Sequence, residues 1–238
     1  MRIELVPTVE EILHEQIFNR TVVVIDVLRA SSTIVTALGH GFSHVIPVET
    51  IGQANALRNA DSLLAGERHC KKIPEFDFNN SPTTIMKGDY TNKHLILTTT
   101  NGTRAIQKAE RANHLMIGSF LNATACIKHA LTQKLDITLY CAGTRQEFAL
   151  EDGLAAGYMV HKAKQLNPHI HTCDLAEALE KSYLYLADRM PDQLMLTTTG
   201  RRLVQHNFVE DILHCGKIDL YNLVPVIKEK RILPHLVS

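Results

Sequence analysis

The stretch Leu95-Ile96-Leu97-Thr98-Thr99-Thr100-Asn101-Gly102-Thr103-Arg104-Ala105 decides the fold, because it joins a buried strand to a helix through a tight polar loop. Its apolar start is typical of a buried strand, and apolar residues recur at helical spacing from Ala105 onward. In an open parallel sheet, such a connection lies at the carboxyl end of the strand, where ligands bind. The helix start adds unpaired N–H groups and a partial positive charge, which favour an anion.

The polar residues of this loop have two interpretations. Asn101 and Thr103 either cap the helix or bind the oxygens of a ligand. Gly102 lets the backbone approach closely, and Arg104 offers a planar fork for phosphate or carboxylate. The loop alone is therefore either an ordinary capped helix start or an anion site.

Two further segments repeat this pattern, which favours the anion site. The apolar run 21–25 leads into Asp26-Val27-Leu28-Arg29-Ala30-Ser31-Ser32-Thr33 and a helical pattern. The run 137–141 leads into Ala142-Gly143-Thr144-Arg145, and Glu151-Asp152 then opens another helix. Each of the three loops carries an arginine with small hydroxyl residues, and two of them carry acids.

Composition excludes several classes of function. The 238 residues contain 25 Lys and Arg against 25 Asp and Glu, so charge gives no reason to expect binding to nucleic acid or an anionic membrane. The apolar runs are shorter than the roughly 20 residues that span a bilayer. Five cysteines without a CxxC pair are typical of reduced thiols, so we expect a cytoplasmic protein. No Walker phosphate-binding loop is present in the sequence.

Strands and helices alternate along the chain, which predicts an α/β fold with a mostly parallel, mixed central sheet. We expect residues 1–238 to form a single domain, because no linker or low-complexity segment divides them. Further strands are predicted at 3–6, 44–48, 62–65, 112–117 and 220–224. Further helices are predicted at 8–18, from 50 onward, at 122–131, 154–164 and 175–186, with a short one that Ser81 caps and Pro82 begins.

The segment 196–200, Leu-Thr-Thr-Thr-Gly, resembles the central loop but lacks an apolar strand before it. It predicts a capped helix with no part in chemistry.

Taken together, the motifs resemble one known family. Asp26–Thr33, Gly66-Glu67-Arg68, Phe76-Asp77-Phe78-Asn79-Asn80-Ser81-Pro82, Thr98–Ala105 and Cys141–Arg145 are similar, in this order, to the 2-phosphosulfolactate phosphatase family. The resemblance implies a three-layer α/β/α fold. It also implies a magnesium-dependent phosphatase that converts 2-phospho-3-sulfolactate to 3-sulfolactate and phosphate. The chain departs from the family pattern at Cys70, Glu75 and Asn79, where the family is expected to have glycine.

The predicted site combines arginine forks with hydroxyl, amide and glycine residues, as a substrate with three anionic groups requires. We expect Asp26, Arg29 and Arg104 to act in catalysis. The expected substrate-binding residues are Ser31, Ser32, Thr33, Arg68, Asn80, Ser81, Thr99, Thr100, Asn101, Gly102, Thr103, Gly143 and Arg145.

Magnesium prefers an oxygen shell with one or two carboxylates, and Asp26, Glu67 and Asp152 are the expected ligands, with Glu151 in reserve. Asp26 could instead attack phosphorus itself. Leu28 stands where a second acid would assist that attack, which favours a metal ligand and direct attack by water.

Two alternatives share the same loops: a phosphatase for another small phosphorylated carboxylic acid, and a non-catalytic protein that binds an anionic metabolite. The expected partner is a small anionic substrate, with neither nucleic acid nor membrane. A homo-oligomer is compatible with the sequence.

Overall fold

The computed structural model describes residues 1–237, and its central feature is a mixed sheet of 11 strands. One group of parallel strands contains β1 (Arg2–Val6), β2 (Arg20–Ile25), β7 (His114–Gly118), β8 (Asp136–Cys141) and β9 (His171–Thr172). A second parallel group contains β3 (Val45–Pro47), β4 (Ser62–Arg68) and β6 (His94–Thr98), and β5 (Lys71–Lys72) runs antiparallel to β4.

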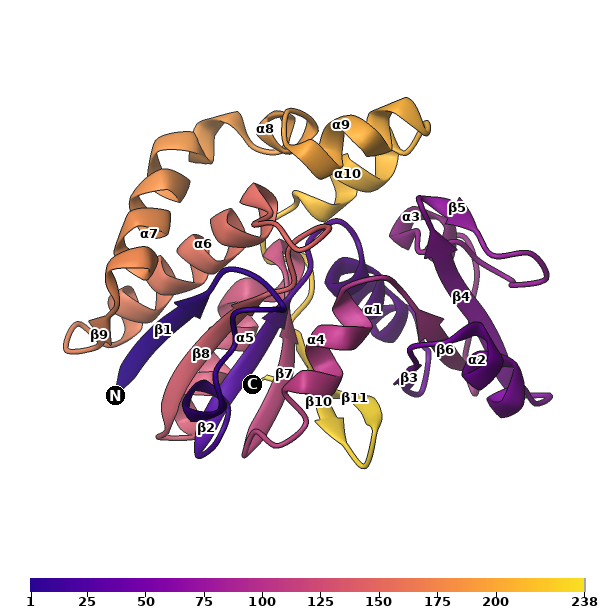
Figure 1. The fold of residues 1–238 in the computed structure, drawn as a ribbon, viewed down its shortest axis with the longest axis horizontal. Coiled ribbons are helices and arrows are strands. Elements are labelled where there is room, and N and C mark those ends of the chain that lie inside the picture. Colours follow the sequence, from indigo (N-terminus) through magenta and orange to yellow (C-terminus); the bar gives the residue numbers. More distant parts are fainter. Residues whose placement is uncertain (238) are drawn as a thin grey trace.

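A hairpin of β10 (Leu223–Lys228) and β11 (Arg231–Leu236) lies between the two groups. β10 pairs with β7 through Val226 and Met116, and β11 pairs with β3 through Ile232 and Val45. The C-terminal hairpin therefore joins both parallel groups into one sheet (Figure 1).

Helices cover both faces of the sheet. Successive side chains of β2 point to opposite faces and so pack into two different cores. Val23 and Ile25 face a core that includes α5 (Ala123–Thr132), α6 (Leu150–Leu166) and α7 (Asp174–Leu186). Val22 and Val24 face a second core with α1 (Ala30–Gly39) and α4 (Gly102–Lys108). The prediction of a three-layer α/β/α fold is confirmed.

Smaller helices complete the chain. They are η1 (His14–Gln16), α2 (Ile51–Leu57), α3 (Pro82–Ile85), η2 (Phe120–Asn122), η3 (Ala187–Arg189), α8 (Asp192–Met195), α9 (Thr198–Gln205) and α10 (Val209–Cys215). Ser81 caps α3 and Pro82 begins it, as predicted. Within residues 1–237, no helix has the length and apolar character needed to cross a membrane.

The helix predicted at 8–18 is wrong. A helix there would bond the N–H of Leu13 to the carbonyl of Val9. Instead, the Leu13 N–H donates to Gln16 Oε1, and the Val9 carbonyl accepts from Tyr140 and Lys108. Tertiary hydrogen bonds therefore replace helical ones, and only the single turn η1 forms.

The strand predicted at 220–224 is too early, and the strand after it was missed. β10 begins at Leu223, and β11 is mostly exposed, so it lacks an alternating apolar pattern. Glu229 and Lys230 form the turn at φ 48° and 63°, and neither is a residue that signals a left-handed turn.

Candidate active site

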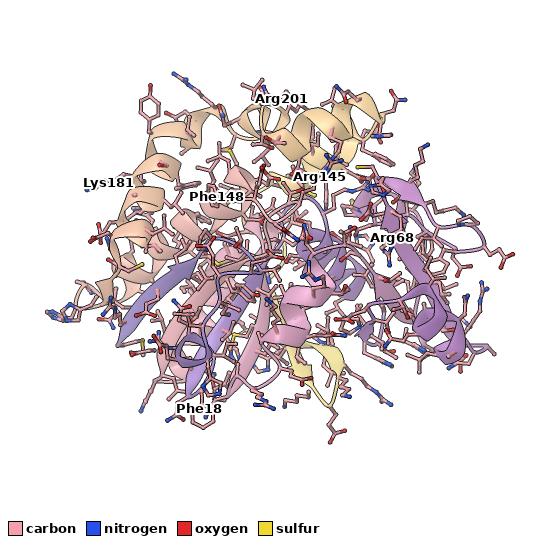
Figure 2. All side chains as sticks on the ribbon, viewed as in Figure 1. Phe18, Arg68, Arg145, Phe148, Lys181 and Arg201 are labelled. Carbon is pink, nitrogen blue, oxygen red and sulfur yellow. The ribbon has the colours of Figure 1, made fainter. Side chains whose placement is uncertain are left out.

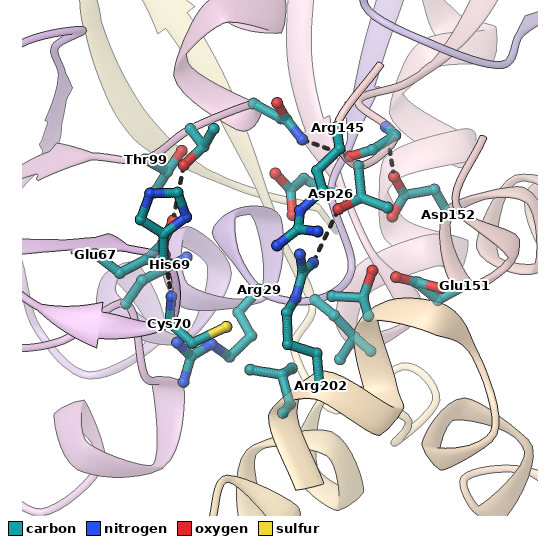
Figure 3. A pocket seen from close by; sticks show the side chains of 18 residues that line it. Asp26, Arg29, Glu67, His69, Cys70, Thr99, Arg145, Glu151, Asp152 and Arg202 are labelled. Atoms are coloured by element: carbon teal, nitrogen blue, oxygen red, sulfur yellow. Dashed lines mark hydrogen bonds between the residues drawn. The ribbon is translucent and has the colours of Figure 1, made fainter. Parts of the chain in front are cut away.

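Residues that follow β2, β4, β6 and β8 meet at one cavity of about 130 Å³ (Figure 3). α6 and α9 complete its wall. The lining residues are Asp26, Leu28, Arg29, Glu67, His69, Cys70, Asn80, Thr99, Thr100, Asn101, Gly143, Thr144, Arg145, Glu151, Asp152, Thr199, Arg202 and Leu203.

Asp26 is almost fully buried at the end of β2, where the first turn of α1 fixes it. Its Oδ1 accepts the Ala30 N–H at 3.1 Å, and its own N–H donates to Ser31 Oγ at 2.9 Å. Its Oδ2 lies close to Gly102, where any Cβ would come within 2.8 Å of that oxygen. Glycine at 102 therefore makes room for the carboxylate and does not itself line the cavity.

Acidic neighbours surround Asp26. Burial raises the pKa of Asp26 to about 7 against the opposing hydrogen bond from Ala30, and Glu67 and Glu151 raise it further. Burial, followed by the charges of Asp26 and Glu151, also raises the pKa of Asp152 well above its usual value. A cation among these carboxylates would relieve their repulsion.

Asp152 connects two of the loops. Its Oδ1 accepts the Val27 N–H at 2.8 Å, and its Oδ2 accepts the Gly143 N–H at 3.1 Å. Asp152 thus ties the loop after β2 to the loop after β8. Glu151, the next residue, is also buried, and its Oε2 has no hydrogen-bond partner among residues 1–237.

Glu67 has a structural part in the loop after β4. Its Oε2 accepts the Cys70 N–H at 2.7 Å, and its Oε1 accepts from Thr100 Oγ1 at 3.2 Å. Cys70 and Glu75 both have φ of 66°, a left-handed conformation that glycine adopts most easily. This explains two of the three positions where glycine was expected, whereas Asn79 is not among the residues with positive φ.

Arg29 lines the cavity but is already paired. Its Nη1 donates to Asp211 Oδ2 at 2.6 Å, and its guanidinium lies 4.2 Å from the ring centre of Phe208. Both charged side chains are almost completely buried. Asp211 also accepts from Ser81 and from the N–H and hydroxyl of Thr83, so it anchors Arg29 to the start of α3.

The structure brings ten of the predicted site residues to the cavity. They are Asp26, Arg29, Glu67, Asn80, Thr99, Thr100, Asn101, Gly143, Arg145 and Asp152. Arg145 has φ of 53°, and its side chain points into the cavity (Figure 3).

Arg104 is the main correction, because its side chain does not line the cavity. It is 42% exposed and pairs with Glu10 at 3.3 Å. Arg68 is also outside, since it donates to the carbonyls of Glu67 and Glu49 and to Thr98 Oγ1. Helical geometry explains the outcome for Arg104, which points away from the cavity while the loop before it lines the cavity.

The predicted hydroxyl residues of the helix starts support the loops from behind. Ser31 holds the Asp26 backbone, Ser32 Oγ donates to the Val27 carbonyl, and Thr103 Oγ1 donates to the Thr99 carbonyl. Ser81 is occupied with its helix and with Asp211, and buried Thr33 does not reach the cavity.

Sequence reasoning missed the contribution of α9. Thr197 caps this helix by accepting the Gly200 N–H, so the prediction of a capped helix at 196–200 is confirmed. The expectation that it takes no part in the site is not supported, because Thr199, Arg202 and Leu203 line the cavity. No local pattern marks them, since only the tertiary fold brings α9 over the loops (Figure 1).

The donor chemistry of the cavity fits magnesium, although no group of three or more His, Cys, Asp or Glu side chains in residues 1–237 is arranged to hold a metal ion. Magnesium usually takes only one or two carboxylates, with phosphate and water completing its shell. The buried Oε2 of Glu151 without a partner and the crowded carboxylate of Asp26 match that requirement.

Comparison with known proteins agrees with this geometry. The family model described as 2-phosphosulpholactate phosphatase matches residues 6–230. A protein of Thermotoga petrophila named "Probable 2-phosphosulfolactate phosphatase" is 40% identical over 208 residues, covering 87% of this chain and 89% of the relative. A protein of the same name from Clostridium acetobutylicum is 34% identical over 238 residues, covering 98% and 100%. The chain therefore belongs to the 2-phosphosulpholactate phosphatase family.

Proposed function

We propose that this protein is a magnesium-dependent phosphatase that hydrolyses 2-phospho-3-sulfolactate to 3-sulfolactate and phosphate. The observation that carries the proposal is one cavity lined by both carboxylates and arginines, in a member of this family. The carboxylates suit a cation that neutralises a phosphoryl group, and the arginines suit the remaining anionic groups of the substrate.

Asp26 and Glu151 are the carboxylates that would hold magnesium, which supplies charge neutralisation at the phosphate. Both oxygens of Asp152 and both oxygens of Glu67 already accept hydrogen bonds, so these two acids serve mainly to shape the loops. The proposed ligands therefore differ from the expected set of Asp26, Glu67 and Asp152. Glu151, which was only a reserve candidate, takes the place of Glu67 and Asp152.

Asp26 would act as a metal ligand, and water rather than this carboxylate would attack phosphorus. Its Oδ1 accepts the Ala30 N–H and its Oδ2 lies against Gly102, so the starts of α1 and α4 hold the carboxylate in place for a cation. The side chains of Thr99 and Thr100, in the loop before α4, line the cavity and would bind the phosphate oxygens.

One observation favours a second candidate, a phosphatase for another small phosphorylated carboxylic acid. Cys70 places a side chain in the cavity at a position where glycine was expected, and this would alter the shape available to the substrate. A non-catalytic binding protein would need the arginines but not the buried acids.

Phosphate release from a panel of phosphorylated three-carbon acids, with and without Mg²⁺, tests the proposal. We expect the highest kcat/KM for 2-phospho-3-sulfolactate and no turnover without a divalent cation. A higher value for a substrate that lacks the sulfonate would favour the second candidate. Binding without any phosphate release would indicate the non-catalytic protein.

A further inference from the structure

α9 contributes two polar side chains to the cavity that the predicted phosphatase chemistry does not use. Thr199 and Arg202 are three residues apart, so they share one face of the helix. Both line the cavity, whereas Arg201 is exposed on the outer side of the same helix (Figure 2).

Each of these two side chains has one buried polar atom that makes no hydrogen bond in the described part of the chain. Arg202 Nε and Thr199 Oγ1 are inaccessible to solvent and have no hydrogen-bond partner among residues 1–237. A buried polar group without a hydrogen bond is destabilising, so a ligand that pairs with both atoms gains binding energy. Arg202 Nη2 donates to Thr144 Oγ1 at 2.9 Å, which fixes the guanidinium in the cavity (Figure 3).

The three arginines that line the cavity differ in whether a carboxylate neutralises their charge. Arg29 is neutralised by Asp211 at 2.6 Å. Arg145 and Arg202 have no carboxylate within ion-pair distance in the described part of the chain. These two cations are therefore free to bind an anionic group of a ligand.

The acids limit where an anionic group can bind in the cavity. Asp26 and its acidic neighbours Glu67 and Glu151 repel anions unless a cation lies between, so the phosphoryl group belongs on their side with magnesium. A second acidic group of the same small molecule would need cationic partners of its own. The α9 side of the cavity offers the cation and the hydroxyl that this second group needs.

We propose that Arg202, with Thr199 beside it, binds the acidic group of the substrate that is not transferred, a carboxylate or a sulfonate, and so selects phosphorylated acids over plain phosphate esters. This inference rests on the proposed phosphatase function. It adds to that function a specificity site on α9, which the sequence motifs do not include.

Four secondary phosphate esters built on the same three-carbon frame test the proposal. They are isopropyl phosphate, which has no further acid, 2-phospholactate with a carboxylate, 1-sulfopropan-2-yl phosphate with a sulfonate, and 2-phospho-3-sulfolactate with both. The measured quantity is the ratio of kcat/KM for each acid to that for isopropyl phosphate.

In Arg202→Gln we expect this ratio to fall about 100-fold for the substrates that carry the recognised group, which corresponds to about 2.7 kcal/mol. The single-acid esters show whether that group is the carboxylate or the sulfonate. Arg202→Lys should recover part of the ratio, and Thr199→Val should lower it by up to about tenfold. Arg201→Gln is the matched control and should keep the wild-type ratio.

An equal loss on all four esters, or no loss on any, would overturn the inference. Circular dichroism and thermal unfolding would identify a variant that fails to fold. If the wild-type protein hydrolysed none of the esters, the proposed function would fail. Calorimetric binding of 3-sulfolactate would still test Arg202, because it needs no turnover. We expect at least tenfold weaker binding in Arg202→Gln, and equal binding would refute the inference.

Discussion

Arg29 and Asp211 form a buried ion pair at 2.6 Å, although 182 residues separate them in the sequence. Both side chains are at most 2% exposed. The pair joins the loop after β2 to α10, and Asp211 extends the contact to the start of α3 through Thr83. The orientation of a cavity arginine thus depends on a carboxylate outside the cavity.

Asp211→Asn should reduce both stability and activity, because it leaves the Arg29 charge buried without its counter-charge. Removing one partner of a buried pair costs about 3–5 kcal/mol, and urea unfolding measures that loss. Asp211 is a positioning residue, so a double-mutant cycle with Arg29→Gln should show strong coupling in kcat/KM. Additive effects would contradict this role. Exposed Glu210→Gln is the control.

Changing Glu151 should selectively weaken the binding of Mg²⁺. We expect Glu151→Gln to raise the Mg²⁺ concentration for half-maximal activity more than tenfold, because it removes a buried carboxylate oxygen that has no hydrogen-bond partner among the described residues. Asp152→Asn should mainly lower the thermal midpoint, because it weakens the bonds to Val27 and Gly143. If Asp152→Asn instead raised the Mg²⁺ requirement and Glu151→Gln lowered the thermal midpoint, Asp152 would be the metal ligand and Glu151 the structural residue.

Asp26→Asn should nearly abolish turnover and weaken Mg²⁺ binding. Single-turnover hydrolysis in oxygen-18 water separates the two mechanisms for the wild-type protein. Mass spectrometry should find the label in the released phosphate and not in the Asp26 carboxylate. Label in that carboxylate would show that Asp26 attacks phosphorus and that water then cleaves an aspartyl phosphate.

Arg104→Lys should retain kcat/KM within about threefold, which corresponds to less than about 0.7 kcal/mol. The reason is its exposed pair with Glu10, away from the cavity. Surface pairs of this kind contribute at most about 1 kcal/mol to stability. A loss of more than tenfold would return Arg104 to the catalytic part predicted from sequence, and Arg145→Lys provides the cavity comparison.

His214 should make the protein less stable in mild acid. Burial lowers the pKa of His214 from 6.5 to about 4, with a further lowering by Lys217, and Asp211 opposes it. The unfolded chain therefore takes up a proton first as the pH falls. The stability that the neutral ring contributes is therefore complete above about pH 6.5 and decreases as the pH falls to about 4.

Urea unfolding of His214→Gln between pH 7 and pH 4.5 measures this effect. The variant should lose stability at pH 7, where Thr36 loses its ring partner, and should show a flatter pH dependence than the wild-type protein. Exposed His169→Gln should follow the wild-type curve. A slope for His214→Gln as steep as that of the wild-type protein would contradict the assignment.

The parts of the fold that sequence predicts are those with local signals. Apolar runs and helix-start residues define the three strand–loop–helix units at β2, β6 and β8, and most of the cavity follows from them. The false helix at 8–18 shows the limit of such signals, because tertiary bonds from Tyr140 and Lys108 take the Val9 carbonyl.

The missed parts of the site depend on contacts across long sequence separations. Arg202 lies in a helix whose sequence predicts only a capped segment, and no element is predicted over α10, which carries Asp211. These two residues acquire their roles at the site because α9 and α10 pack over loops from the first two thirds of the chain. Arg104 is the converse case, since a residue adjacent to a true site loop points out of the site.

The hairpin between the two parallel groups constrains how the protein is made. Synthesis delivers β1 to β9 before β10 and β11, yet in the sheet formed by residues 1–237 β3 and β7 are connected through β10 and β11. The sheet therefore cannot be completed until β10 and β11 have left the ribosome. Until then, both inner edges are unpaired, so a nascent or prematurely terminated chain should be a substrate for chaperones and proteases.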